Sequence, residues 1–139
     1  MEPQIKNNVL ITGASGLLGT AITSRLDHPW KALHHGDPGW DPEKGRCDSG
    51  LIEGSSVVIH LAGEPIAAGR WTETQKKKIY TSRVNGTRAL AESMASLDKK
   101  PATLICASAV GFFGNRGEEV LHESSSAGDG FLPEVVKDW

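Results

Sequence analysis

The sequence of 139 residues predicts an α/β fold built on a doubly wound parallel sheet. Short apolar runs, of the kind found in strands covered on both faces, alternate along the chain with segments of helical periodicity. The connections between the apolar runs are long enough for crossover helices. The first apolar run also leads into a helical segment through a turn that contains Gly13, Gly16 and Gly19.

The N-terminal part is predicted to form strand, helix and strand. Val9–Ile11 is the first strand, and after the glycine turn apolar residues recur at helical spacing over Leu18–Leu26. Pro29 ends this helix, because proline lacks an amide hydrogen and disfavours helical geometry in the residue before it. A second short strand is predicted over Lys31–His34.

The middle and the C-terminal part continue the alternation. Glycine and proline are frequent in Gly36–Gly54, which is predicted to be mostly surface loop with one short strand candidate near Trp40. Gly86 lies inside a predicted helix, where glycine is unfavourable, so we expect a close-packing reason for it. The later elements are a strand over Val57–Leu61, a helix from a capping box at Thr72 to about Leu97, a strand over Thr103–Ala107 and a helix at the end of the chain.

Composition excludes several classes of protein. The net charge is −2, so no strong field of one sign is available to attract nucleic acid. No segment approaches the about 20 apolar residues that span a bilayer, and the polar start Met1–Asn8 is unlike a signal peptide, so we expect a cytoplasmic protein with no membrane partner. Cys47 and Cys106 have no Cys-x-x-Cys spacing, and the adjacent His34 and His35 point opposite ways on a strand, so no metal site is predicted.

The glycine turn is the strongest functional motif. Gly13 permits a tight turn, Gly16 lets the backbone approach a diphosphate, and Gly19 lets helix and strand pack closely. The first amides of the following helix would face the phosphates. The alternative is a turn whose glycines only pack and bind no nucleotide. The residues predicted to contact a dinucleotide here are Gly13, Ser15, Gly16, Leu17, Leu18 and Gly19.

The end of the second predicted strand bears on the choice of dinucleotide. An acidic residue usually stands there and binds the adenosine ribose, whereas this chain has His34 and His35. Without the acid, repulsion of a 2′-phosphate is weaker and His34 could donate to it, which favours NADP over NAD. The alternative is that both imidazoles are ordinary surface groups.

Several segments resemble a known family in order and spacing. They are Thr12–Gly19, Trp40–Pro42, Leu61–Ile66, Arg70–Trp71, Ser82–Val84 with Gly86–Thr87, Ala107–Gly114 and Gly117–Glu119. Together they resemble the sugar-nucleotide-epimerase-like, or NAD-dependent epimerase/dehydratase, branch of the atypical short-chain dehydrogenase/reductases. The resemblance covers almost the whole chain and implies a Rossmann-like domain that binds NAD or NADP.

The resemblance also assigns roles to single residues. Leu61, Ala62 and Gly63 would line the cofactor at the carboxyl end of their strand, with Glu64 at the cleft. Arg83 would hold a phosphate or a substrate carboxylate, the alternative being a surface ion pair on a helix.

The family's usual proton relay is missing. Relatives use a Ser or Thr with a Tyr-x-x-x-Lys pair, and the equivalent positions here are Phe131, which has no hydroxyl, and Val135, which has no ammonium. Ser108 is the catalytic candidate, and Glu64 or a group beyond Trp139 are the other acids considered.

Two functions are therefore expected. The first is an NAD(P)-dependent oxidoreductase or epimerase-like enzyme for a small polar substrate, with nucleotide sugars among the candidates. The second is a dinucleotide-binding module without turnover, acting as a regulator or interaction partner. The resemblance further implies that residues 1–139 are the N-terminal cofactor-binding half only, truncated before the substrate-binding lobe, with an apolar sheet edge that promotes self-association.

Overall fold

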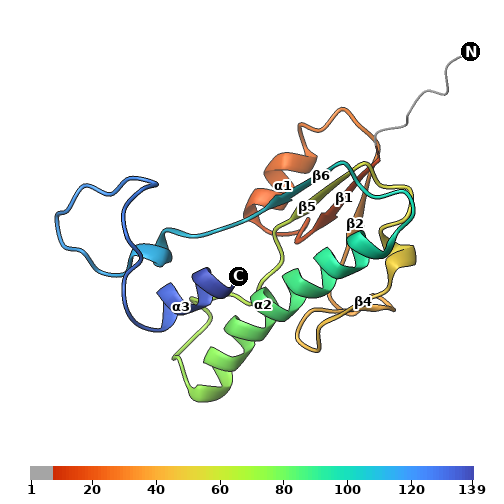
Figure 1. The fold of residues 1–139 in the computed structure, drawn as a ribbon. Coiled ribbons are helices and arrows are strands. Elements are labelled where there is room, and N and C mark those ends of the chain that lie inside the picture. The colour runs from red at the N-terminus through yellow and green to blue at the C-terminus, as the bar shows by residue number, and fades with distance from the viewer. Residues whose placement is uncertain (1–7) are drawn as a thin grey trace, which may run out of the picture. The chain divides into compact units, whose positions relative to one another are not determined.

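The computed structural model describes residues 8–139, so the polar start of the chain over residues 1–7 lies outside the described part. The described chain forms two compact units, one ending at Cys106 and the other comprising Ala107–Trp139. Figure 1 shows the course of the chain.

The first unit is organised by a four-stranded sheet in the order β2-β1-β5-β6, in which all neighbours are parallel. Its strands are β1 (Val9–Thr12), β2 (Trp30–Leu33), β5 (Val57–His60) and β6 (Thr103–Cys106). The chain passes from β1 outward to β2 and then returns across β1 to β5. This reversal confirms the prediction of a doubly wound parallel sheet and places its switch point between β1 and β5. The predicted strands differ from the observed ones by one residue at their ends.

Two helices cover the two faces of this sheet (Figure 1). Alternate residues of β1 belong to two separate core clusters. Val9 and Ile11 pack in the cluster that includes Ile22 of α1 (Leu17–Thr23), whereas Leu10 packs with Leu90 of α2 (Glu73–Ser96). The side-chain period of two in a strand produces this division. The two inner strands β1 and β5 are buried on both faces, which explains their continuous apolar runs, whereas all four residues of β6 are exposed.

The helix α1 ends at Thr23, three residues before the predicted end at Leu26. The amide of Arg25 bonds to the carbonyl oxygen of Ile22, and the Ser24 hydroxyl donates to the carbonyl oxygen of Ala21. These bonds tighten the last turn and stop the helix. Leu26 nevertheless packs against the α1-side cluster, which is why the apolar spacing extends past the helix.

The helix α2 begins and ends close to its predicted bounds. The Thr72 hydroxyl accepts a hydrogen bond from the Gln75 amide at 3.2 Å, as the capping box predicts. The expected packing reason for Gly86 is confirmed, because a Cβ there would lie 2.7 Å from the Cβ of Pro42.

The prediction of mostly surface loop over Gly36–Gly54 is wrong in part. The short strand near Trp40 is present as β3 (Trp40–Asp41), and it pairs antiparallel with β4 (Arg46–Cys47), which is followed by the 3-10 turn η1 (Ser49–Leu51). Trp40 and Ile52 are buried in the α2-side cluster. Cys47 and Leu51 pack against the same cluster, and the irregular spacing of these four residues produces no periodic pattern.

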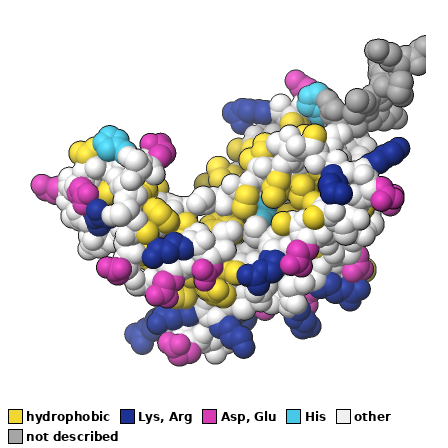
Figure 2. All heavy atoms as spheres, viewed as in Figure 1, with side chains coloured by type: hydrophobic (Ala, Val, Ile, Leu, Met, Phe, Trp, Pro, Cys, Tyr) yellow, Lys and Arg dark blue, Asp and Glu magenta, His cyan; other side chains and the backbone are white. Residues whose placement is uncertain are grey.

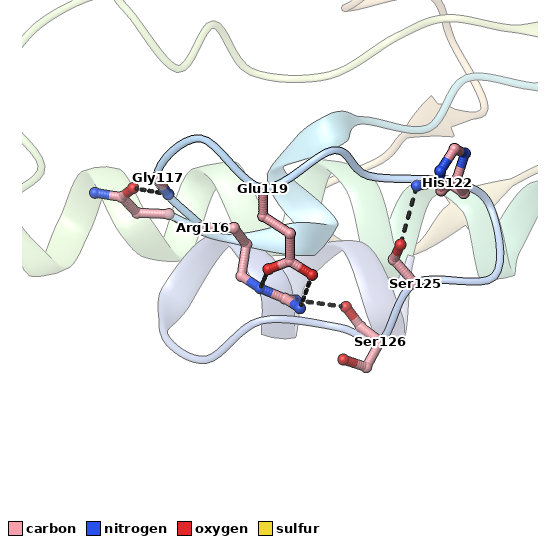
Figure 3. Close-up of polar contacts among 7 residues, drawn as sticks. Arg116, Gly117, Glu119, His122, Ser125 and Ser126 are labelled. Atoms are coloured by element: carbon pink, nitrogen blue, oxygen red, sulfur yellow. Dashed lines mark hydrogen bonds and ion pairs between the residues drawn. The ribbon is translucent and has the colours of Figure 1, made fainter.

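The second unit contains the 3-10 helix η2 (Val110–Phe113) and α3 (Phe131–Asp138), the helix expected at the end of the chain. The loop between them is closed at its base, where the Gly128 amide donates to the carbonyl oxygen of Phe112 at 2.9 Å. Arg116 ties the loop internally by donating to both carboxylate oxygens of Glu119 and to the carbonyl oxygen of Ser126 (Figure 3). The loop between η2 and α3 is therefore held closed by its own hydrogen bonds.

Acidic and basic side chains are interspersed on the face drawn in Figure 2. Across residues 8–139, no helix has the length and apolarity needed to cross a bilayer. Within the same range, no group of three or more His, Cys, Asp and Glu side chains could hold a metal ion.

Candidate functional site

A cleft of about 390 Å³ opens at the carboxyl ends of β1, β2 and β5, beside the switch point of the sheet. Ligands collect at this place in open α/β sheets. The segments that follow these three neighbouring strands line the cleft. The lining residues are Gly13, Ser15, Gly16, Leu33, His34, His35, Trp40, Pro42, Glu43, Leu61, Ala62, Gly63, Glu64, Pro65 and Ser82.

Two glycines of the turn after β1 are required by the fold itself. Gly13 has a φ of +73°, and a Cβ there would lie 2.9 Å from the backbone nitrogen of Ala62. A Cβ at Gly19 would collide with the carbonyl oxygen of Gly13 and with the backbone of Ala14. The positive φ of Gly13 fits the predicted tight turn, and the close packing at Gly19 was also predicted. The contact that Gly13 allows between the turns after β1 and β5 was not.

Gly16 differs from these two glycines. Its backbone is extended (φ −75°), a conformation open to any residue, and it caps α1 without a side-chain hydrogen bond. A Cβ at Gly16 would meet only the carbonyl oxygen of Gly13, at 3.4 Å, and Gly16 lines the cleft. The fold therefore has no strong need for glycine here, whereas a ligand that approaches the backbone does. This observation fits a diphosphate lying on the turn.

A buried polar network beneath the cleft joins β1, β5 and α2. The Thr12 Oγ1 lies 2.6 Å from Nδ1 of His60 and accepts from the amides of Leu61 and Ala62 at 3.2 Å, while Nε2 of His60 lies 3.0 Å from Oγ1 of Thr87. Because the lone pairs of Thr12 receive two amides, we assign its hydroxyl proton to Nδ1, which leaves Nε2–H to donate to Thr87.

The environment of His60 keeps it neutral. The side chain is fully buried, Trp40 packs on it edge to face, and burial lowers the pKa of His60 to about 4. A neutral imidazole with one donor and one acceptor matches the two hydroxyls it contacts. Sequence reasoning missed this network, because an isolated His in an apolar strand carries no motif.

The turn after β5 is held by α2. The Glu64 amide donates to Oγ of Ser82 at 3.0 Å, and Nη1 of Arg83 donates to the carbonyl oxygen of Glu64 at 2.9 Å. Nε2 of Gln75 donates to Oε1 of Glu64 at 3.3 Å. A Cβ at Gly63 would lie 3.1 Å from Cζ of Arg83, so the missing side chain leaves room for the guanidinium. Burial lowers the pKa of Arg83, and the Glu64 carboxylate opposes this effect.

The two histidines after β2 both line the cleft, although neighbours on a strand would point apart, because β2 ends at Leu33 and they lie in the following turn. The Asp37 carboxylate caps this turn by accepting from the His34 amide at 2.7 Å. Glu43 also lines the cleft and is the acid that sequence reasoning did not anticipate here.

The cleft brings together most of the predicted dinucleotide contacts: Gly13, Ser15, Gly16, His34, Leu61, Ala62 and Gly63. Leu17 and Leu18, 90% and 61% exposed, are not among the lining residues, nor are the buried Gly19 and the half-buried Arg83. Ser108 belongs to the second unit. Trp40, Pro42 and Ser82 line the cleft without having been predicted to, since each reaches it by long-range packing.

Comparisons with known proteins agree with this geometry. The sequence model of the NAD dependent epimerase/dehydratase family matches residues 9–131. An epimerase family protein of Mycobacterium bovis, Mb2239, is 38% identical over 140 residues, which cover 94% of this chain and 46% of that protein. The YfhF epimerase family protein of Bacillus subtilis is 34% identical, with 95% of this chain and 48% of that protein covered.

Solved structures show the same likeness. The crystal structure of a nucleoside-diphosphate sugar epimerase from Corynebacterium glutamicum has 41% identity and a TM-score of 0.78 over 95% of this chain and 29% of that chain. The human epimerase family protein SDR39U1, solved with NADPH, has 27% identity and a TM-score of 0.75 over 95% of this chain and 47% of that chain. The chain thus spans about half the length, or less, of these relatives.

Proposed function

Because the chain belongs to the NAD dependent epimerase/dehydratase family, we propose that its cleft binds NAD or NADP for an oxidoreductase or epimerase-like reaction on a small polar substrate. Nucleotide sugars are the substrate class we favour. Family membership favours this enzyme over a dinucleotide-binding module without turnover. A cytoplasmic location is part of the proposal.

The observation that carries the proposal is the open backbone at Gly16. Two neighbouring glycines are explained by contacts within the fold, and Gly16 is not, although it lines the cleft. A diphosphate needs a bare backbone at such a point. The amides that follow Gly16 then supply donors for the phosphate oxygens.

The order of the strands gives the proposed direction of the dinucleotide. The adenosine would lie over the turn after β2, the diphosphate over Gly13 and Gly16, and the second nucleoside beside Leu61, Ala62 and Gly63. When bound, the cofactor supplies an acceptor or donor for hydride. Buried Leu33 and Trp40 help to exclude water from the inner end of the cleft.

Cofactor preference and proton transfer extend the proposal. His34 and His35 are the groups available to a 2′-phosphate, which favours NADP, whereas the Glu43 carboxylate in the same cleft favours NAD. Asp37 is the first acidic residue after β2, but its carboxylate already accepts a hydrogen bond from the His34 amide. We therefore keep NADP as the favoured cofactor. Ser108 is our candidate for the proton-transferring hydroxyl.

Titration of the protein with NADPH and NADH, followed by tryptophan fluorescence, tests the proposal. Trp40 lies in the cleft and is expected to report binding. Gly16→Val should abolish binding at concentrations that saturate the parent, while changing the free energy of unfolding by about 1 kcal/mol or less. The Cβ branch would occupy the space that the diphosphate needs.

Gly50→Val is the matched control, because Gly50 has nothing within 4 Å of its Cβ position and lies outside the cleft. It should bind as the parent does. If Gly16→Val folds and still binds either dinucleotide with parental affinity, the site assignment is wrong.

Self-association remains part of the proposal. The edge strand β6 exposes Leu104 and Ile105, the latter at 51%. Exposed apolar edges favour pairing with another chain. Sedimentation over a range of concentrations measures it.

A further inference from the structure

Glu64, in the wall of the cleft, is held to α2 at three points. Its amide, its carbonyl oxygen and one carboxylate oxygen are each bonded to a different side chain of α2, namely Ser82, Arg83 and Gln75. The half-buried carboxylate lines the cleft. Among the described residues, the structure gives Oε2 of Glu64 no hydrogen-bond partner. A loop carboxylate held in this way is pre-organised to accept a hydrogen bond from a ligand.

The position of Glu64 selects the part of a dinucleotide that it can meet. It follows β5, whereas the turn expected to hold adenosine follows β2, on the other side of β1. A dinucleotide with its diphosphate on Gly16 therefore presents its second nucleoside to Glu64. A carboxylate repels the phosphates themselves but accepts strongly from hydroxyl groups.

From this placement we propose that Glu64 binds the ribose hydroxyls of the second nucleoside of the cofactor, and that Arg83 is a positioning residue that acts through Glu64. The inference rests on the proposed binding of NAD or NADP in the cleft. It gives the chain a polar anchor for the nucleoside next to the reacting ring.

The role of Arg83 follows from its contacts. Nη1 donates to the carbonyl oxygens of Glu64 and of Ile79, at 2.9 Å and 3.3 Å, so the guanidinium ties the turn to the helix. The group lies against Gly63, and Arg83 is not one of the residues that line the cleft. It therefore orients the Glu64 turn and does not touch a phosphate.

The test compares three ligands that share the adenosine diphosphate part. NADH and ADP-ribose carry the second ribose, and ADP does not. In calorimetric titrations, Glu64→Gln should raise the dissociation constants of NADH and ADP-ribose about tenfold, as expected for the loss of a hydrogen bond to a charged acceptor. The dissociation constant of ADP, measured by competition with NADH where binding is weak, should change by less than about twofold. Glu92→Gln, on the exposed side of α2 and outside the cleft, is the matched control.

The role of Arg83 is tested with Arg83→Met alone and combined with Glu64→Gln. If Arg83 acts through Glu64, the single variant weakens NADH but not ADP, and the double variant binds NADH within about twofold of Glu64→Gln. Loss of ADP binding in Arg83→Met, or losses that multiply in the double variant, would show direct phosphate contact and overturn the positioning role. Retained ADP binding shows that each variant is folded at the glycine turn.

The outcomes separate this inference from the function on which it rests. If the parent binds NADH and Glu64→Gln binds NADH and ADP-ribose equally well, Glu64 does not hold the ribose, although the cleft binds the cofactor. Equal losses for all three ligands also contradict the inference, since they place Glu64 at the adenosine diphosphate part. If the parent binds none of the three and does not bind NADPH either, both proposals are wrong.

Discussion

Two turns meet at the switch point of the sheet, and they are built in different ways. The turn after β1 is shaped by backbone contacts: Gly13 touches the backbone at Ala62, and Gly19 lies against Gly13. The turn after β5 is shaped by side chains of α2, with Ser82 and Arg83 bonded to the backbone of Glu64. The first turn is rigid because its glycines lack a Cβ and let the backbone pack closely. The second is rigid because side chains of α2 bond to its backbone.

The buried network joins the two turns. The single hydroxyl of Thr12, the last residue of β1, accepts from the amides of Leu61 and Ala62 and contacts His60. One side chain therefore links the two walls of the cleft, beside the main-chain bond from the Leu61 amide to the carbonyl oxygen of Thr12. Variants of each component can show which kind of contact the site depends on most.

The largest effect is expected from Gly19→Ala in the first turn. The added Cβ would collide with the carbonyl oxygen of Gly13 and lie 2.6 Å from the Cα of Ala14, so the helix must move away from the turn. We expect a loss of about 3 kcal/mol or more in the free energy of unfolding, measured by urea denaturation. Gly16→Ala in the same turn is the control and should lose about 1 kcal/mol or less. Similar losses in both variants would contradict the distinction between packing and ligand-facing glycines.

The same difference explains how much could be predicted from the sequence. The glycine turn and the strand before it are local patterns, so the strand predicted over Val9–Ile11, the tight turn at Gly13 and the close packing at Gly19 were confirmed. Glu64 was expected at the cleft, but the contacts that hold it come from α2. Such contacts depend on how the elements pack, which single-sequence periodicity does not encode.

The hairpin after β2 shows the same limit. Trp40 was expected in a short strand, whereas its place in the core and beside the cleft was not. His60 was predicted only as part of a strand. Its hydrogen bonds to Thr12 and Thr87 join residues 48 and 27 positions apart. No short-range signal reports pairs at those separations.

Thr12→Val should have the next largest effect, and it tests the link between the two turns. Valine keeps the shape of threonine, but the Ala62 amide and Nδ1 of His60 lose their partner in a buried site. We expect a loss of about 2 to 3 kcal/mol in urea denaturation. Thr23→Val, whose hydroxyl bonds to the carbonyl oxygen of Thr20 on the exposed side of α1, is the control and should lose about 0.5 kcal/mol or less. Equal losses would mean that the network does not couple the walls.

The smallest of the three effects is a pH dependence that originates in His60. Its folded pKa is about 4, whereas an unfolded His has a pKa of about 6.5. The unfolded state therefore binds more protons between these values, and stability is complete above about pH 6.5 and declines as the pH falls toward 4. Between pH 7 and pH 5 the free energy of unfolding should fall by about 2 kcal/mol from this residue.

Urea denaturation of the parent and of His60→Gln at pH 7 and pH 5 measures this contribution. The variant is expected to be less stable at pH 7, because glutamine cannot bridge Thr12 and Thr87 as the imidazole does. Its stability should nevertheless change less than that of the parent over the same interval, because no titrating group remains in the network. A variant that loses as much stability as the parent between pH 7 and pH 5 would assign the pH dependence to other groups and leave His60 a purely geometric link between the two walls.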